Sequence, residues 1–290
     1  MRVDSLRGWD RVLGINARNA HIGASNPPSA IRLVNDKHAT KLRLEQVGAP
    51  TSATIALVRD VRTLRRMDLG AELGDAWALK PNQGLGGNGI LIAAERVDGA
   101  WRRHSGREIS EREVRHQVRM IIDGEFSGRG RDAALVEPLI VAHPDMARLA
   151  HQGLPDVRVI CTDDVPRLAM ARLPTAASGG RANLHQRAIG AAVDLRTGEI
   201  TQALVGGRPV TTHPDTGTEL VGATIPFWDE IRDASARCSS ATGLRYLGVD
   251  VVVDVERGPL ILEVNARPGL QIQNVTGRGL WETLLTEEGR

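Results

Sequence analysis

The sequence is short of several residue types, and each shortage narrows what the chain can be. Only two cysteines occur among 290 residues, Cys161 and Cys238, and they are too far apart for a C-x-x-C or zinc motif. Aromatic residues make up 3% of the chain, which leaves few rings on which unpaired bases could stack. No apolar run reaches the roughly 18 residues that a membrane-spanning helix requires. We therefore expect two reduced core thiols, no transmembrane segment and no nucleic-acid partner.

The chain also lacks any block of like charge, because its 37 basic and 35 acidic residues interleave throughout. The N-terminal stretch MRVDSLRGWDRVLGIN has no apolar core of the kind that a signal peptide carries, so we expect a cytoplasmic location. Lysine is scarce: Lys37, Lys41 and Lys80 are the only three among the 37 basic residues. Each of them is a candidate position for a compact ammonium in place of a guanidinium.

Hydrophobic periodicity and capping signals predict an α+β protein of two lobes with mainly antiparallel sheets, because strands come in pairs. Residues 1–34 show no clear element and are expected to form an irregular arm. Asp60, and Ser110 with Glu113, are predicted helix N-caps, while Gly48 and Gly243 are predicted stops. Helices are expected over 36–47, 61–67, 111–122 and 226–242. Strands are expected over 51–58, 76–80, 90–96, 134–141, 157–161, 168–173, 249–255 and 259–264.

A glycine-rich loop, PNQGLGGNG, follows the strand that ends at Lys80. Gly84, Gly86 and Gly89 satisfy G-x-G-x-x-G, but a strand follows instead of the helix that a dinucleotide fingerprint requires. No G-K-[ST] closes the loop, so it is not a P-loop either. A strand, glycine loop and strand form the flap with which kinases cover ATP phosphates, and Lys80 is placed to reach them. The alternative is a flexible hairpin turn that binds nothing.

Near the C-terminus, polar residues interrupt two apolar strands that a short turn joins. Glu263 and Asn265 share one face of PLILEVN, and Asp250 shares a face of VDVVVDV with Asp254. A hairpin brings Asp250 level with either Glu263 or Asn265, and two carboxylates with an amide oxygen suit magnesium. A solvated edge is the alternative, and it fits Asp254 better than it fits Glu263. The sequence predicts a metal site formed by Asp250, Glu263 and Asn265.

Together these motifs resemble the ATP-grasp superfamily, and within it the RimK-type glutamate ligases and their shorter alpha-L-glutamate ligase-like relatives. The resemblance rests on stretches that follow the family's order over residues 35–275. They are NDKHATKLRLEQVGAP, ALKPNQGLGGNGILI, VEPLI, PDVRVI, GGRANLH and GVDVVV…LILEVNARPG.

The resemblance implies an ATP-grasp fold in which two α+β lobes with mainly antiparallel sheets grip ATP between them. Residues 1–34 would be an arm in place of a preceding domain, 35–136 the N-terminal lobe with the flap, and 137–290 the C-terminal lobe with the metal site. Because RimK-type ligases carry a Rossmann-like domain ahead of these lobes, a protein partner could replace it here. The sequence also leaves open whether the chain forms an oligomer.

The resemblance also implies a role for each matched residue. The expected nucleotide contacts are Lys37 or Lys41 with Lys80, the flap glycines Gly84, Gly86, Gly87 and Gly89, the adenine-binding segment with Glu137, Leu139 and Ile140, and Asp156 at the ribose. The expected ligands of two magnesium ions, with manganese as a substitute, are Asp250, Glu263 and Asn265. The expected catalytic residues are Arg158, Arg181, Asn183 and Arg267. Asp145 competes with Asp156 for the ribose, and His185 is a weaker candidate base.

The activity implied is an ATP-dependent carboxylate–amine ligation through an acyl phosphate. The substrates would be small-molecule or peptide acids and amines, with glutamate or another amino acid added to a peptide or protein. Two alternatives stay open: a nucleotide-binding subunit that works with a partner without turnover, and a phosphotransferase that stops at phosphorylation.

Overall fold

In the computed structural model, which describes residues 11–84, 87–128 and 130–281, the chain divides into two units. The larger unit combines the chain up to Val34 with Arg43–Thr51 and everything from Val141 onward. The smaller unit combines Asn35–Leu42 with Ser52–Ile140. Helix α3, Lys37–Gln46, therefore begins in the smaller unit and ends in the larger one.

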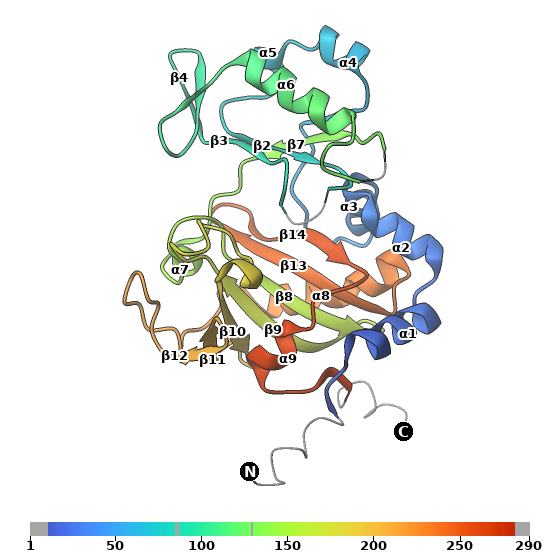
Figure 1. Cartoon of the computed structure of the whole chain (residues 1–290), viewed down its shortest axis with the longest axis vertical. Coiled ribbons are helices and arrows are strands. Elements are labelled where there is room, and N and C mark those ends of the chain that lie inside the picture. The colour runs from blue at the N-terminus through green and yellow to red at the C-terminus, as the bar shows by residue number, and fades with distance from the viewer. Residues whose placement is uncertain (1–10, 85–86, 129, 282–290) are drawn as a thin grey trace. The chain divides into compact units, whose positions relative to one another are not determined.

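The smaller unit is built on a four-stranded antiparallel sheet in the order β1-β7-β2-β3. Figure 1 shows β7, β2 and β3 of this sheet. A second, three-stranded sheet has the order β4-β5-β6. The strands are β1 Ala56–Val58, β2 Trp77–Pro81, β3 Leu91–Ala93, β4 Glu95–Val97, β5 Ala100–Arg102, β6 Glu108–Ile109 and β7 Ala134–Pro138. The helices are α4 Val61–Arg66, α5 Leu69–Glu72 and α6 Glu111–Ile122. Because β2 and β3 are antiparallel neighbours, the predicted strand, glycine loop and strand arrangement is confirmed.

Helix starts in the smaller unit follow the caps that the sequence contains. The Asp60 carboxylate accepts from the Thr63 N–H at 2.8 Å, and the Ser110 hydroxyl accepts from the Glu113 N–H at 3.2 Å. Along α6 the buried side chains recur at helical spacing, Val114, Val118, Ile121 and Ile122, so this helix covers the core with one face. The core also contains Trp77 and Trp101, whose rings meet edge to face.

The larger unit is built on a seven-stranded sheet in the order β12-β11-β10-β9-β8-β13-β14, and its neighbouring strands are antiparallel. The strands are β8 Asp156–Thr162, β9 Val165–Leu173, β10 Ile189–Val193, β11 Ile200–Val205, β12 Arg208–Val210, β13 Tyr246–Asp254 and β14 Gly258–Asn265. The helices are α1 Ile15–Ser25, α2 Pro28–Asn35, α7 Pro144–Ala147, α8 Trp228–Thr242 and α9 Gln271–Thr276, with a 3-10 turn at Leu184–Gln186.

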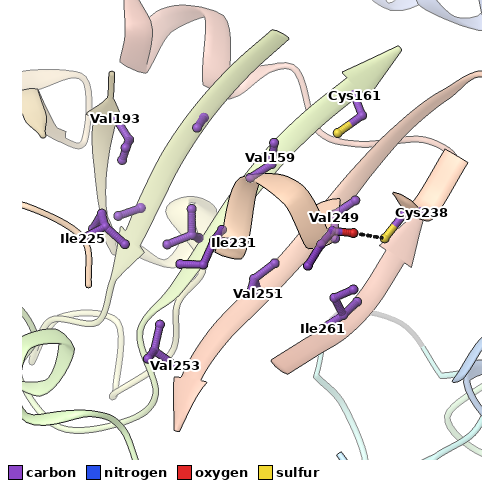
Figure 2. Close-up of a cluster of buried hydrophobic side chains, with 14 of the residues drawn as sticks. Val159, Cys161, Val193, Ile225, Ile231, Cys238, Val249, Val251, Val253 and Ile261 are labelled. Carbon is purple, nitrogen blue, oxygen red and sulfur yellow. Dashed lines mark hydrogen bonds between the residues drawn. The ribbon is translucent and has the colours of Figure 1, made fainter. Parts of the chain in front are cut away.

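The two faces of this sheet carry different side chains because residues alternate along each strand. One face packs against α8, and Figure 2 shows Ile231 and Cys238 of that helix beside Val159, Val249 and Val251. Cys238 and Cys161 are both free and buried, as the sequence predicted, and burial raises the pKa of Cys238 to about 12. The opposite face carries a second apolar cluster, which includes residues of α1 and α9. Charged residues from β8, β9 and β13 lie on that second face.

The expectation of an irregular arm over residues 1–34 is wrong from Ile15 onward, because α1 and α2 fill that stretch. Helix α1 has a single buried residue, Ile22, so its sequence carries almost no amphipathic signal. Tertiary contacts hold it instead. The buried Asn26 side chain accepts from the N–H groups of Arg245 and Tyr246 and donates to the Tyr246 carbonyl.

The closing hairpin pairs Asp250 with Glu263, one of the two registers that the sequence allowed. A bulge follows, so Val251 pairs with Ile261 and the strict alternation expected for β14 is broken. Ile261 and Val264 both join the core beside α8 as a result. Asp254 does not face solvent: it is 2% exposed, and its carboxylate accepts from the N–H groups of Glu256 and Arg257 at the turn.

Several element boundaries also differ from expectation. The strand predicted over 90–96 is divided between β3 and β4, which belong to different sheets, and the strand predicted over 134–141 ends at Pro138. The strand predicted from Thr51 is limited to β1, since Thr51 itself forms only an isolated bridge with Ile261. The helix predicted from Pro226 begins at Trp228, because Phe227 takes a left-handed conformation at the N-cap. Within the described residues, no helix has the length and apolar character needed to cross a bilayer.

Candidate active site

Two of the three lysines meet one buried carboxylate inside the smaller unit. The Glu137 Oε1 lies 2.5 Å from the Lys41 Nζ, and its Oε2 lies 2.5 Å from the Lys80 Nζ. The three side chains come from β7, α3 and β2, and they are only 5%, 7% and 14% exposed. The structure therefore brings together three residues that were predicted to contact the nucleotide.

Electrostatics keep Glu137 ionised although it is buried. Burial alone would raise the pKa of its carboxyl, but the Lys80 and Lys41 ammonium groups outweigh burial and hold that pKa below its usual value. Two cations share one anion here, so the cluster has one surplus positive charge. A net positive charge on these three side chains, next to the glycine loop that follows Lys80, suits a phosphate group. Both oxygens of Glu137 bind lysines in this structure, and the predicted contact of Glu137 with adenine stays a prediction.

Lys37 occupies a different position, at the base of the glycine loop. Its Nζ donates to the Gly84 carbonyl at 2.6 Å, and its backbone N–H donates to the Asn82 carbonyl. Gly89 has a φ of +76°, and a Cβ there would lie 2.5 Å from the Phe126 ring, so only glycine fits. Gly87 also has a positive φ, while Gly86 lies outside the described residues.

The adenine-binding segment predicted by the resemblance follows β7 directly. Leu139 donates its backbone N–H to the Ala76 carbonyl at 3.3 Å, and Ile140 is the last residue of the smaller unit. Both side chains are partly exposed. Their proposed role stays a prediction.

In the larger unit, two arginines and two aspartates form a buried charge ladder across β8, β9 and β13. Asp156 and Arg172 are directly opposite each other, as are Arg158 and Asp250. Both arginines bind in a forked geometry: Arg172 to Asp156 at 2.6 Å twice, and Arg158 to Asp250 at 2.7 and 2.6 Å. A further contact of 2.9 Å joins the Arg172 Nη2 to Asp250. The ladder is therefore electrically neutral and continuous.

The two aspartates of the ladder differ in pKa because they differ in cationic partners. Burial raises the pKa of Asp156 to about 6; the Arg172 guanidinium opposes that rise, while the neighbouring Asp250 charge adds to it. Burial would raise the pKa of Asp250 too, but Arg158 and Arg172 outweigh it and the pKa is lowered. Burial also opposes the charge of Arg172, yet Asp156 and Asp250 raise its pKa above the ordinary value. Asp250 is thus the more firmly ionised of the two.

The predicted metal ligands meet at one end of this ladder. Glu263 is the cross-strand partner of Asp250, and the Asn265 amide donates to the Asp250 Oδ2 at 3.2 Å. Within the described ranges no group of three His, Cys, Asp or Glu side chains is placed to hold a metal, so the site depends on two carboxylates and an amide. These hard oxygen donors fit magnesium in chemistry and register. Coordination by Asp250 requires that some of its contacts with Arg158, Arg172 or Asn265 be given up.

A pocket of about 490 Å³ opens beside the ladder, entirely within the larger unit. We call it the arginine pocket, because Arg18, Arg158 and Arg172 line it. Its other walls are Met170 of β9 and residues 12–15, 183–185, 269–271 and 273–274. Arg158 and Asn183, both predicted to be catalytic, are among these lining residues, and so is His185.

Other predicted residues lie outside this arrangement. Arg181 is exposed and its Nη1 approaches the Gln186 side chain at 3.5 Å, while Arg267 is exposed on the loop after β14. Neither lines the arginine pocket. Asp145, the rival of Asp156, lies on α7, is 54% exposed and pairs with Arg148. The role of each stays a prediction.

Sequence reasoning missed Arg172, Arg18 and Gln273. Arg172 interrupts the apolar strand stretch LAMARL, and a charge in such a run is the same signal that identified Glu263. Arg18 carried no signal, because the segment around it was expected to be irregular. Gln273 binds both the N–H and the carbonyl of Leu13 through its side-chain amide, a contact between residues 260 positions apart.

Comparison with known proteins identifies the family and the fold. The sequence profile described as sugar-transfer associated ATP-grasp matches residues 16–287. No protein of curated function matches the chain. Similar solved structures include the ATP-grasp ligase PsnB with the precursor peptide PsnA2 and AMPPNP (17% identity, TM-score 0.50, 92% of this chain and 63% of that one). Others are the D-alanine–D-alanine ligase of Bacillus anthracis with ATP (13%, 0.51, 94% and 72%) and the biotin carboxylase of Campylobacter jejuni in a β-γ-ATP complex (14%, 0.55, 89% and 46%).

The chain thus spans about three-fifths of the length of the PsnB structures that it matches. Identities this low show a shared fold, and that fold is the ATP-grasp fold with α+β content and antiparallel sheets, as the sequence predicted. The matching profile covers nearly the whole chain, and on that ground the protein belongs to the sugar-transfer associated ATP-grasp family.

Proposed function

We propose that the protein is an ATP- and magnesium-dependent ligase that joins a carboxylate to an amine. One observation carries the proposal: Arg158 binds Asp250 in a fork and also lines the arginine pocket. A single guanidinium therefore connects the predicted metal-binding carboxylate with a cationic small-molecule site. Membership of an ATP-grasp family supports the same reading.

The proposed nucleotide contacts come from the smaller unit. The Lys41, Lys80 and Glu137 cluster has a surplus positive charge for the ATP phosphates. The glycine loop supplies backbone N–H groups, and Lys37 fixes the base of that loop through the Gly84 carbonyl.

In the proposed reaction, a substrate carboxylate oxygen attacks the γ-phosphorus of ATP, which gives an acyl phosphate and ADP. An amine nitrogen then attacks the acyl carbon, phosphate leaves with the bonding electron pair, and the amine loses a proton as the amide forms. Magnesium, held by Asp250, Glu263 and Asn265, would neutralise phosphate charge. Arg158 would stabilise the negative charge that develops on the transferred group and the acyl oxygen.

The proposal also includes the class of substrate. The RimK-type motifs support an amino acid, such as glutamate, added to a peptide or protein. The PsnB structure contains a precursor peptide, which also favours a peptide substrate. Two magnesium ions, replaceable by manganese, and a partner protein complete the proposal.

The direct test incubates the full chain with Mg-ATP and a panel of amino acids and short peptides. We expect ADP release that needs both an acid and an amine, with a product heavier than the acid by the amine minus water. Glu263→Gln should abolish turnover while the fold is kept, because Glu263 is only partly buried. Asp250→Asn is a poorer probe, since it leaves Arg158 buried without its carboxylate partner.

A nucleotide-binding subunit without turnover is the second candidate. One observation favours it: both oxygens of Asp250 already accept from arginines, which leaves the carboxylate neutralised without a metal. Titration calorimetry separates the two candidates. A subunit binds ATP with equal affinity in wild type and Glu263→Gln, and no acid with an amine produces ADP in either.

A further inference from the structure

The arginine pocket has a charge pattern that distinguishes between the two substrates of the proposed ligase. Three guanidinium groups line it, and among the described lining residues there is no aspartate or glutamate. An ammonium group placed there would meet only cations and neutral groups, whereas a carboxylate would meet cationic hydrogen-bond donors. The pattern favours the acid over the amine.

The three arginines do not contribute equally to this preference. Arg158 and Arg172 are neutralised by Asp250 and Asp156 in the charge ladder. Arg18 contacts only neutral groups among the described residues: its Nη1 donates to the Pro268 carbonyl at 3.1 Å, and its other nitrogens approach the Asn19 amide oxygen. Arg18 therefore supplies the uncompensated positive charge of the pocket, which matches one negative charge on the ligand.

The remaining surface is largely apolar. Four of its lining residues are aliphatic or thioether side chains: Leu13 and Met170 are almost fully buried, and Leu184 and Leu270 are partly exposed. A volume of about 490 Å³ is within the usual range for small-molecule sites, which starts at roughly 300 Å³. Such a pocket suits an acid with an apolar body and disfavours a strongly hydrated polyanion.

The N-terminal segment forms one wall of this pocket and is firmly fixed there. The Gln273 side-chain amide, 5% exposed, accepts from the Leu13 N–H at 2.8 Å and donates to the Leu13 carbonyl at 3.1 Å. The same Oε1 also accepts from the Leu280 N–H. Residues 12–18 thus reach the pocket through buried hydrogen bonds, and they bring both Leu13 and Arg18 with them.

We propose that the arginine pocket binds the acid substrate, a monocarboxylate with an apolar body and no ammonium beside its carboxylate, and that Arg18 of the N-terminal segment selects it. An N-acylated amino acid or the C-terminal end of a peptide has this chemistry, and a free amino acid does not. The role of the bound acid as a substrate rests on the proposed ligase function. The binding of the acid is argued from the residues of the pocket alone.

The test measures binding of N-acetyl-leucine, leucine and N-acetyl-leucinamide to the full chain by titration calorimetry without ATP. N-acetyl-leucine should bind at least about tenfold more tightly than either other compound, because leucine adds an ammonium and the amide lacks a carboxylate. N-acetylglycine should bind more weakly than N-acetyl-leucine, by about fourfold for each buried methylene that is lost.

The matched variants are Arg18→Ala and Arg32→Ala. Both remove one positive charge from the first two helices, but Arg32 is exposed on α2 and outside the pocket, whereas Arg18 of α1 lines it. Arg18→Ala should weaken N-acetyl-leucine binding roughly tenfold to a hundredfold, with partial recovery in Arg18→Lys. Arg32→Ala should bind as wild type does.

A second measurement, ADP release with glycinamide as a constant amine, separates this inference from the proposed function. Arg18-dependent binding without ADP release would refute the ligase and leave the pocket assignment intact. ADP release with equal KM values in the two variants would refute the role of Arg18 and leave the ligase intact. Leucine binding as tightly as N-acetyl-leucine, or no Arg18-dependent binding by either acid, would overturn the inference.

Discussion

Glu137→Gln is the substitution for which the structure gives the sharpest expectation. The change keeps the shape of the side chain but removes the negative charge that Lys41 and Lys80 share at distances of 2.5 Å. Because all three groups are almost completely buried, the two ammonium groups are left close together without their counterion. Loss of one member of a buried ion pair costs about 3–5 kcal/mol.

The chain offers a matched control in the same unit. Glu113 also binds two cations, Arg103 at 3.0 Å and Arg107 at 2.5 Å, but it is 28% exposed and its partners are 38% and 57% exposed. Water screens this exposed cluster, so Glu113→Gln should cost no more than about 1 kcal/mol. The two variants remove the same charge from the same number of partners and differ in burial.

Hydrogen exchange of peptides from β2 and β7 measures how much local stability each variant loses within the smaller unit. Glu137→Gln should speed exchange there by a hundredfold or more, and Glu113→Gln by less than about tenfold. The pKa of Glu137 is lowered in the folded state. The extra stability of wild type over Glu137→Gln is therefore fully present above the unfolded pKa of 4.5, and it is lost as the pH falls through the lower folded pKa. Equal exchange in the two variants at neutral pH would refute the reasoning.

Three further expectations concern stability. Asp254→Ala should lower the free energy of unfolding by about 2–3 kcal/mol in urea titrations, because the carboxylate accepts from Glu256, Arg257 and Val141. Burial opposes ionisation of Asp254, but Arg257 and the backbone donors lower its pKa, so this difference should shrink as the pH falls below the unfolded value of 3.8 toward the lower folded value. A difference that does not shrink in acid would contradict it. Gly89→Ala should reduce Tm more than Gly87→Ala: both have a positive φ, but only Gly89 would clash with Phe126, and equal losses would exclude that clash. The unfolding free energy of wild type relative to Asp156→Asn should fall by about 3 kcal/mol as the pH rises from 3.8 to about 6, because the pKa of Asp156 is raised in the folded state. A difference that does not change with pH would show that the fold does not raise this pKa.

Much of the local structure could be predicted from single residues. Asp60 and Ser110 cap their helices where expected, and the Asp163–Asp164 turn joins β8 to β9, two strands that the sequence predicted. The pairing of Asp250 with Glu263 was one of two predicted registers. Each of these features depends on interactions within about fifteen residues, where side-chain chemistry and backbone preference agree.

Other features depend on long-range contacts that no local pattern shows. The β14 bulge moved Ile261 into the core, and the sequence pattern alone favoured strict alternation. Helix α1 has too little amphipathic character to be predicted, and its position depends on Asn26 and Gln273 binding backbone groups more than 200 residues away.

The sequence by itself therefore determined the kinds of residue at the site: a lysine before a glycine loop, an acid on β7, and carboxylates with an amide on the final hairpin. Those residues could be recognised because charge in an apolar strand is costly without a partner. Only the tertiary structure decided which partner each charge has. It gave Glu137 two lysines and Asp250 two arginines, and it placed Arg18 in a pocket whose described lining includes no carboxylate, because strand register and distant backbone contacts set these distances.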